Sequence, residues 1–270
     1  GYRATRQSVF DAPRADLAAV GRHVIAGYRD PMELKRLIAA GAVGGVFVTA
    51  RNVGTKTVAK LAAEIAEFQT IARENGHPPL IITSDQEGGM VSRLSPPLAR
   101  PKALAKVIQG SKGEDDRAKA VRDAAEAAGR DLAKLGVTLN FAPVVDVDFG
   151  IRNPADRHSR IGQRAISKDP AAVALAAIAY CEGLRASGVM CTLKHFPGLG
   201  RVKADTHVGK ASLATPVSEL DQIDWLPFRE TLAASSAAVM VGHVTLAALD
   251  TRPASPSRAV VHGILRDKWR

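Results

Sequence analysis

The 270-residue sequence predicts an α/β fold and, within that class, a (β/α)8 barrel of the TIM type. Short, continuous apolar segments alternate with longer amphipathic ones, which is typical of parallel strands that helices cover on both faces. Nearly every apolar segment is also followed by polar residues. A doubly wound sheet needs such endings only near its switch point, whereas a barrel carries a ring of active-site loops. The polar endings therefore favour the barrel.

Six segments are predicted as strands because they are short, apolar and mostly continuous. Polar residues such as Asn52, Asp85, Asp146, Lys194 and His243 follow them. The predicted strands are residues 23–28, 44–49, 80–84, 138–143, 189–193 and 237–241.

Apolar residues spaced by three or four predict three helices, each ended by a glycine. Asp169 and Pro170 predict the start of the third helix, as an N-cap and a first-turn proline, and Pro227 predicts the start of another, shorter one. The three apolar series run from Val58 to Ala72, from Val121 to Leu135 and from Val173 to Leu184, and the glycines are Gly76, Gly136 and Gly188.

The strand count is lower than a complete barrel requires. Six strands are predicted where eight are needed, and residues 266–270 are predicted to end a helix after the sixth strand. We therefore expect a single barrel domain over residues 1–270, with about two strand-helix units absent or beyond this sequence. No GxGxxG or P-loop follows the first strand, so nucleotide binding has no support.

The composition excludes several classes of partner. The formal net charge is +10, but lysine and arginine are spread along the chain and aromatic residues make up only 4%, so we expect a solvated basic surface and no nucleic-acid partner. No apolar run is long enough to span a membrane. Cys181 falls on a predicted helix and Cys191 on the next strand, without a CxxC motif, which predicts two buried free thiols. Free thiols fit a reducing compartment, so a cytoplasmic location is favoured, with export possible if a signal peptide was removed.

The densest set of reactive side chains follows the fifth predicted strand. Lys194 and His195 place two hydrogen-bonding groups at the end of that strand, on opposite sides unless the chain bends. Asp205 and His207 lie two residues apart beyond a glycine-rich turn, so the carboxylate can orient the imidazole for general acid/base catalysis. A simple surface pair is equally compatible with this spacing.

Three other strand ends carry polar residues. Asp85 can accept hydrogen bonds from two sugar hydroxyls, and Arg93 can reach the same pocket because two glycines let the chain turn between them. Asp146 has too few oxygen ligands nearby for a metal site, so structural hydrogen bonding is predicted for it. Arg164 is unremarkable by itself, and His243 fits a pocket wall or a packed position equally well. Motifs of serine and zinc hydrolases, GxSxG and HExxH, are absent.

Together these motifs resemble glycoside hydrolase family 3, and specifically its β-N-acetylhexosaminidase branch. The resemblance implies retaining hydrolysis of terminal β-linked N-acetylglucosamine, from peptidoglycan fragments or muropeptides, without a cofactor or metal. It implies that His207 is the acid/base with Asp205 as its partner, and that the sugar contacts are Asp85, Arg93, Arg164, Lys194 and His195. The matching motifs are GGVF at residues 44–47, DQEGG at 85–89, NFAPVVDV at 140–147, KHFPG at 194–198 and DTH at 205–207.

The sequence departs from the family pattern in two places. Leu199 stands where the family has a second histidine, and the nucleophilic aspartate of the family follows a seventh strand that this sequence does not reach. Three alternatives therefore stay open: a phosphorylase of the family, a β-glucosidase of the family, and an inactive sugar-binding module. The Asp-x-His loop at residues 205–207 disfavours the β-glucosidase, because β-glucosidases of the family typically take their acid/base from a second domain.

Overall fold

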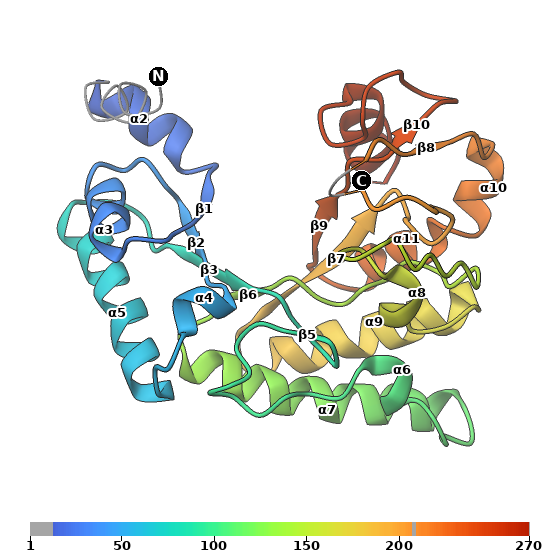
Figure 1. The fold of residues 1–270 in the computed structure, drawn as a ribbon, viewed down its shortest axis with the longest axis horizontal. Coiled ribbons are helices and arrows are strands. Elements are labelled where there is room, and N and C mark those ends of the chain that lie inside the picture. Colours follow the sequence, from blue (N-terminus) through green and yellow to red (C-terminus); the bar gives the residue numbers. More distant parts are fainter. Residues whose placement is uncertain (1–12, 207–208, 270) are drawn as a thin grey trace. The chain divides into compact units, whose positions relative to one another are not determined.

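The computed structural model describes residues 13–206 and 209–269, which fall into two compact units. The first unit contains residues 13–86, 92–100 and 130–140. The second contains residues 87–91, 101–129, 141–206 and 209–269. Figure 1 shows the order of the elements along the chain, and each unit is described by itself below.

The first unit is built on parallel strands in the order β1-β2-β3-β6. Gly27 pairs with Phe47, and Phe47 pairs with Thr83, so the carboxyl ends of β1, β2 and β3 leave the sheet at one level. Each strand lies inside a predicted segment, which confirms those four predictions. The strands are β1 (Ile25–Gly27), β2 (Gly45–Phe47), β3 (Ile81–Ser84) and β6 (Leu139–Asn140).

Helix α5 shows why the apolar periodicity of this unit was informative. Its residues Leu61, Ile65 and Phe68 are buried, and Phe68 meets the Tyr28 ring edge-on with the ring centroids 5.6 Å apart. The helix ends just before Gly76, as predicted, because that glycine adopts a φ of +74° that other residues avoid. The helices of this unit are α2 (Arg14–Gly21), α3 (Pro31–Ala39), α4 (Ala50–Val53) and α5 (Val58–Glu74).

The second unit contains the parallel pair β7 (Met190–Phe196) and β9 (Ala238–Val241), seen side by side in Figure 1. Strand β7 continues three residues beyond the predicted end at 193, so Lys194 and His195 belong to the strand. The physical reason is Phe196, which is fully buried among aromatic rings with centroids 5.3 to 5.7 Å away. Those rings belong to Trp225, Phe228 and Trp269.

The helices of the second unit begin where the sequence predicted. The Asp169 side chain accepts a hydrogen bond from the Ala171 amide at the start of α9 (Pro170–Arg185), and Pro227 lies in the first turn of α11 (Leu226–Ala234). The chain ends on the π-helix η1 (Ala259–Lys268), in agreement with the predicted terminal helix.

The remaining elements are short, apart from α7 (Glu114–Lys134), which contributes residues to both units. Among the described residues, no helix combines the length and the apolar character that crossing a bilayer requires. The short elements are β4 (Gln86–Gly88), β5 (Val91–Ser92), α6 (Leu104–Val107), α8 (Ile161–Arg164), β8 (Ser212–Leu213), α10 (Val217–Gln222) and β10 (Thr245–Leu246).

The prediction of two free thiols was wrong. Cys181 and Cys191 form a disulfide, with Cα atoms 5.3 Å apart. A short turn reverses the chain between α9 and β7, so the end of the helix and the start of the strand run side by side and bring the two cysteines together. Disulfides are typical of oxidising compartments, so the cysteines no longer support a reducing one.

Candidate active site

Lys194 and Glu87 form the centre of a buried group of polar side chains in the second unit. The Lys194 ammonium lies 2.5 Å from Oε1 of Glu87, and both side chains are less than a tenth exposed. Arg164 binds the same carboxylate with two groups, Nε to Oε2 at 2.9 Å and Nη2 to Oε1 at 2.6 Å. Two cations therefore share one carboxylate. Buried charges need such partners, since an unpaired one would carry the full cost of its lost hydration.

The two cations keep Glu87 ionised. Burial by itself would raise the pKa of this carboxyl, but the charges of Lys194 and Arg164 and their hydrogen bonds outweigh it and lower the pKa to about 2. The carboxylate is thus negative over the physiological range and holds the lysine and arginine in fixed positions.

His195 is joined to the same group through a second carboxylate, that of the fully buried Asp146. The His195 Nδ1 lies 2.7 Å from Asp146 Oδ2, and the backbone amides of His195 and Leu199 also donate to Asp146. This confirms the prediction of structural hydrogen bonding for Asp146. On the other side of the ring, His195 Nε2 lies 3.4 Å from Nη2 of Arg164.

The electrostatics favour a neutral His195. Burial lowers the pKa of His195; the Asp146 carboxylate opposes this, and the positive charges of Arg164 and Lys194 add to it. Because Asp146 can only accept, it fixes the proton on Nδ1 and leaves Nε2 with a lone pair.

Alternation along a regular strand would separate Lys194 from His195. The register of β7 against β9 instead shifts between Lys194 and Phe196. As a result, Arg164 contacts both His195 and the carboxylate that binds Lys194. The structure therefore brings together three of the predicted sugar-contact residues, Arg164, Lys194 and His195.

Asp205 is connected to this group through the loop that precedes α8. Its buried carboxylate accepts hydrogen bonds from the His158 amide at 3.1 Å and from the Ser159 hydroxyl at 3.2 Å. The Ser159 carbonyl in turn accepts from Nη1 of Arg164 at 2.7 Å. Asp205 is therefore an anchoring residue of its loop and not a surface group. His207, the predicted acid/base, lies outside the described residues.

Asp85 and Arg93 lie in the first unit, where they line one pocket of about 470 Å³. The Arg93 amide donates to the Asp85 carbonyl at 2.9 Å, so the glycine-containing turn does return Arg93 to the strand end that carries Asp85. The predicted sugar contacts thus form two sets, one within each unit.

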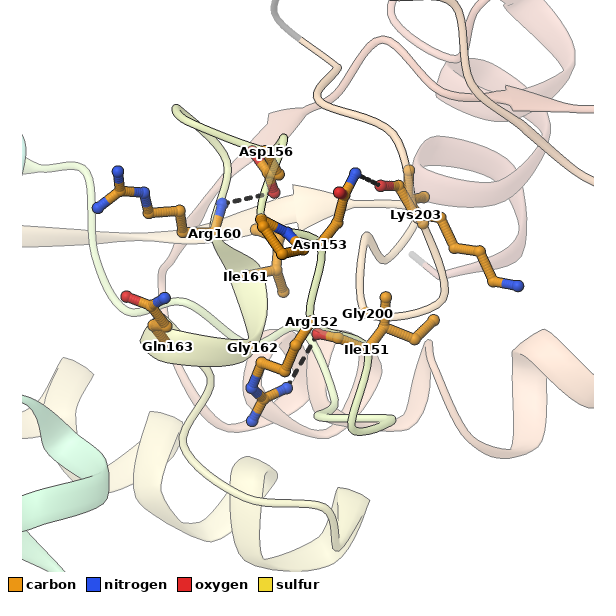
Figure 2. A pocket seen from close by; sticks show the side chains of 12 residues that line it. Ile151, Arg152, Asn153, Asp156, Arg160, Ile161, Gly162, Gln163, Gly200 and Lys203 are labelled. Atoms are coloured by element: carbon orange, nitrogen blue, oxygen red, sulfur yellow. Dashed lines mark hydrogen bonds between the residues drawn. The ribbon is translucent and has the colours of Figure 1, made fainter.

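A smaller pocket, of about 180 Å³, lies between loop residues 151–163 and 200–203 of the second unit (Figure 2). The Asn153 amide joins the loops by donating to the Lys203 carbonyl at 2.7 Å. Figure 2 shows the side chains of Arg160 and Lys203 extending to opposite sides of the view. None of the predicted site residues lines this pocket, and we assign it no ligand.

Sequence reasoning missed Glu87 and the role of Ser159. A signal for Glu87 was available, because the predicted sugar contacts contained three cations, Arg93, Arg164 and Lys194, and only one carboxylate, Asp85. His243 is exposed and contacts the Ser255 hydroxyl through Nδ1 at 2.9 Å. The described residues contain no group of three or more metal-binding side chains.

Acidification is expected to destabilise this cluster in two stages. The unfolded His195 takes up a proton near its ordinary pKa of 6.5 and the folded one only at lower pH, so stability falls as the pH drops below 6.5. Glu87 contributes its full stabilisation of the folded state above pH 4.5, and this contribution is lost as the pH falls from 4.5 to about 2. Urea unfolding of the wild type and of Glu87→Gln between pH 8 and 3 measures how the stability of each protein depends on pH. The stability difference between the two proteins should shrink below pH 4.5; a constant difference would contradict the assignment.

Residues 13–270 match the family model of the glycosyl hydrolase family 3 N terminal domain. The chain therefore belongs to glycosyl hydrolase family 3. Beta-hexosaminidase LpqI of Mycobacterium tuberculosis is 35% identical over 258 residues, which cover 93% of this chain and 60% of that protein. A beta-hexosaminidase of Neisseria meningitidis serogroup C is 36% identical over 246 residues, covering 90% and 64%. The chain thus spans less than two thirds of the length of these relatives.

Solved structures agree with this assignment. A glycoside hydrolase family 3 beta-N-acetylglucosaminidase from Paenibacillus sp. str. FPU-7 matches with a TM-score of 0.83 and 33% identity, over 94% of this chain and 47% of that one. NagZ from Neisseria gonorrhoeae, solved in complex with N-trifluoroacetyl-D-glucosamine, matches with a TM-score of 0.80 and 30% identity, over 91% and 70%. These likenesses confirm the predicted (β/α)8 barrel class of fold.

Proposed function

We propose that the protein is a retaining β-N-acetylglucosaminidase that removes terminal β-linked N-acetylglucosamine from peptidoglycan fragments. The observation that carries the proposal is the buried cluster of Glu87, Lys194, Arg164 and His195. The names of the relatives, beta-hexosaminidase and beta-N-acetylglucosaminidase, support it, as does the acylated glucosamine in the NagZ complex.

The cluster suits a neutral, hydroxyl-rich ligand. Lys194 and Arg164 are donors whose direction is set by Glu87, and His195 offers an acceptor at Nε2. Donors fixed in advance lose little freedom when a sugar binds, so they favour affinity and orientation. In the first unit, Asp85 would accept from sugar hydroxyls, with Arg93 beside it.

In the proposed reaction a carboxylate nucleophile attacks the anomeric carbon while His207 protonates the leaving oxygen. Water, deprotonated by the same histidine, then releases the sugar with retained configuration. Asp205, anchored by His158 and Ser159, would stabilise the imidazolium form of His207. Glu87 and Asp146 are already held by several donors, so we assign them positioning roles and not that of the nucleophile.

Replacing His207 with alanine in the full-length protein tests the acid role. We expect a large loss of kcat on natural disaccharides, whose leaving group needs a proton, and a smaller loss on 4-nitrophenyl N-acetyl-β-glucosaminide, whose leaving group does not. His262→Ala, a change at an exposed histidine of η1, is the matched control and should keep wild-type rates. Equal losses on both substrates would count against His207 as the acid.

The same assay separates the alternatives. If the product in the presence of added inorganic phosphate is N-acetylglucosamine 1-phosphate, the enzyme is a phosphorylase and not a hydrolase. Binding of N-acetylglucosamine by the full-length protein without turnover of either substrate would leave only an inactive sugar-binding module.

A further inference from the structure

Arg201 lies where the chain has left strand β7 and enters the segment that contains the proposed acid/base. Its side chain is largely buried and makes two ion pairs, Nε to Asp224 Oδ2 at 2.9 Å and Nη1 to Glu219 Oε1 at 2.8 Å. The guanidinium carbon also lies over the Phe149 ring, 4.1 Å from its centroid. Two ion pairs and a stacked ring together hold the guanidinium in one position.

The turn that follows α10 holds both ends of the exit from β7. The fully buried Trp225 donates from Nε1 to the Pro197 carbonyl at 2.9 Å. The carboxylate of the preceding residue, Asp224, is almost completely buried and binds Arg201. Because residues 224 and 225 are consecutive, one short turn fixes the positions of both Pro197 and Arg201.

The backbone between these two points is packed too closely to rearrange. The Leu199 amide donates to Asp146 at 2.7 Å. A Cβ atom at Gly200 would lie only 1.9 Å from the Val147 carbonyl oxygen, so a glycine is required at this position. Residues 197–201 therefore lead the chain away from β7 in a single direction.

Further contacts hold the segment beyond Arg201. The Lys203 carbonyl accepts from the Asn153 side chain at 2.7 Å (Figure 2), and the Asp205 carboxylate accepts from two groups of the loop before α8. At the far end of the segment, β8 pairs with β10. Arg201 is nearer to β7 than these contacts, so its ion pairs set the direction in which the segment starts.

We infer that Arg201 is a positioning residue for the proposed acid/base, His207. Its guanidinium is occupied by Asp224 and Glu219, so it acts on the reaction through the direction of the segment and not through contact with the sugar. Proton transfer needs the imidazole within hydrogen-bond reach of the leaving oxygen, and a displacement of about 1 Å can cost about a hundredfold in rate. This inference rests on the proposed function, because it takes His207 as the acid.

Arg201→Gln in the full-length protein tests the inference. We expect kcat on a β-linked disaccharide of N-acetylglucosamine to fall about tenfold or more, with KM changed by less than about twofold, because the proton donor is displaced while the sugar contacts stay. The loss on 4-nitrophenyl N-acetyl-β-glucosaminide should be smaller, since its leaving group needs no proton. Arg229→Gln is the matched control. Arg229 also binds an acid of α10, Asp221, but from α11, and its variant should keep wild-type rates.

A double variant separates positioning from general effects on folding. In a His207→Ala background the acid is already absent, so adding Arg201→Gln should cost nothing further on either substrate. Thermal melts report whether each variant is folded. If Arg201→Gln lowers the rate by the same factor with and without His207, or by the same factor on both substrates, Arg201 is merely structural and the inference is overturned.

Asp224→Asn is a second variant, which keeps the shape of the pair with Arg201 and removes its negative charge. Burial raises the pKa of Asp224 to about 6; Arg201 opposes this rise and Asp146 adds to it. The ion pair is therefore complete well above pH 6 and is lost as the pH falls through 6 and the carboxylate is protonated. The ratio of wild-type kcat to Asp224→Asn kcat on the disaccharide should exceed one at pH 8 and fall towards one at pH 5. A ratio that does not change with pH would contradict positioning by this ion pair.

The failure of this inference and that of the proposed function give different results. If the wild type cleaves both substrates and His207→Ala shows its expected losses, but Arg201→Gln does not share their pattern, only the positioning role is overturned. Wild-type protein that cleaves neither substrate overturns both.

Discussion

Glu87→Gln is expected to lower the free energy of unfolding by about 3 to 5 kcal/mol, the usual cost of breaking a buried ion pair from one side. The change is isosteric, but it leaves the charges of Lys194 and Arg164 without the carboxylate that both bind. Denaturation by urea at pH 7 gives the value directly.

Two further variants show whether the charge is the cause. Glu67→Gln breaks an ion pair with Lys35 on an exposed part of the surface and should change stability by less than about 1 kcal/mol. Adding Lys194→Met to Glu87→Gln removes one of the unpaired cations, so the double variant should be more stable than Glu87→Gln alone. If Glu87→Gln and Glu67→Gln have the same effect, the cluster does not depend on the charge of Glu87.

Asp146→Asn is expected to lower the free energy of unfolding by about 2 to 3 kcal/mol, because an amide cannot accept from every donor that surrounds it. The three donors are the His195 ring, the His195 amide and the Leu199 amide. The fixed tautomer of His195 should be lost at the same time, since its Nδ1 proton no longer faces a carboxylate.

Urea unfolding and the imidazole nitrogen signals in NMR spectra measure the two effects of Asp146→Asn. Asp148→Asn is the matched control. Its carboxylate lies two residues along the same segment and pairs with the half-exposed Arg152. Unchanged imidazole signals in Asp146→Asn would contradict the orienting role of Asp146.

The strands of the fold could be predicted from the sequence because their burial on both faces leaves continuous apolar runs. Helices such as α5 and α9 were equally visible, since their periodic apolar residues end at glycines or begin at a capping aspartate. The end of β7 was not visible. Lys194 and His195 are polar residues inside a strand, and the burial of Phe196, which extends that strand, depends on rings from distant parts of the chain.

The site could be predicted only in part, for a similar reason. Polar residues at strand ends predicted Asp85, Lys194 and His195, and the family resemblance added Arg164, but ion pairing between distant segments is a property of the folded chain. Glu87 is 77 residues from Arg164 in sequence and Asp146 is 49 from His195. The disulfide was missed because the close return of β7 along α9, and not any cysteine motif, brings Cys181 to Cys191.

The most direct test of the central claim is to follow the cleavage of 4-nitrophenyl N-acetyl-β-glucosaminide by the full-length protein with proton NMR. We predict release of N-acetylglucosamine with the β-anomer appearing first, and much slower cleavage of the corresponding β-glucoside. An α-anomer as the first product would contradict the retaining mechanism. Absence of cleavage would contradict the proposed β-N-acetylglucosaminidase activity itself.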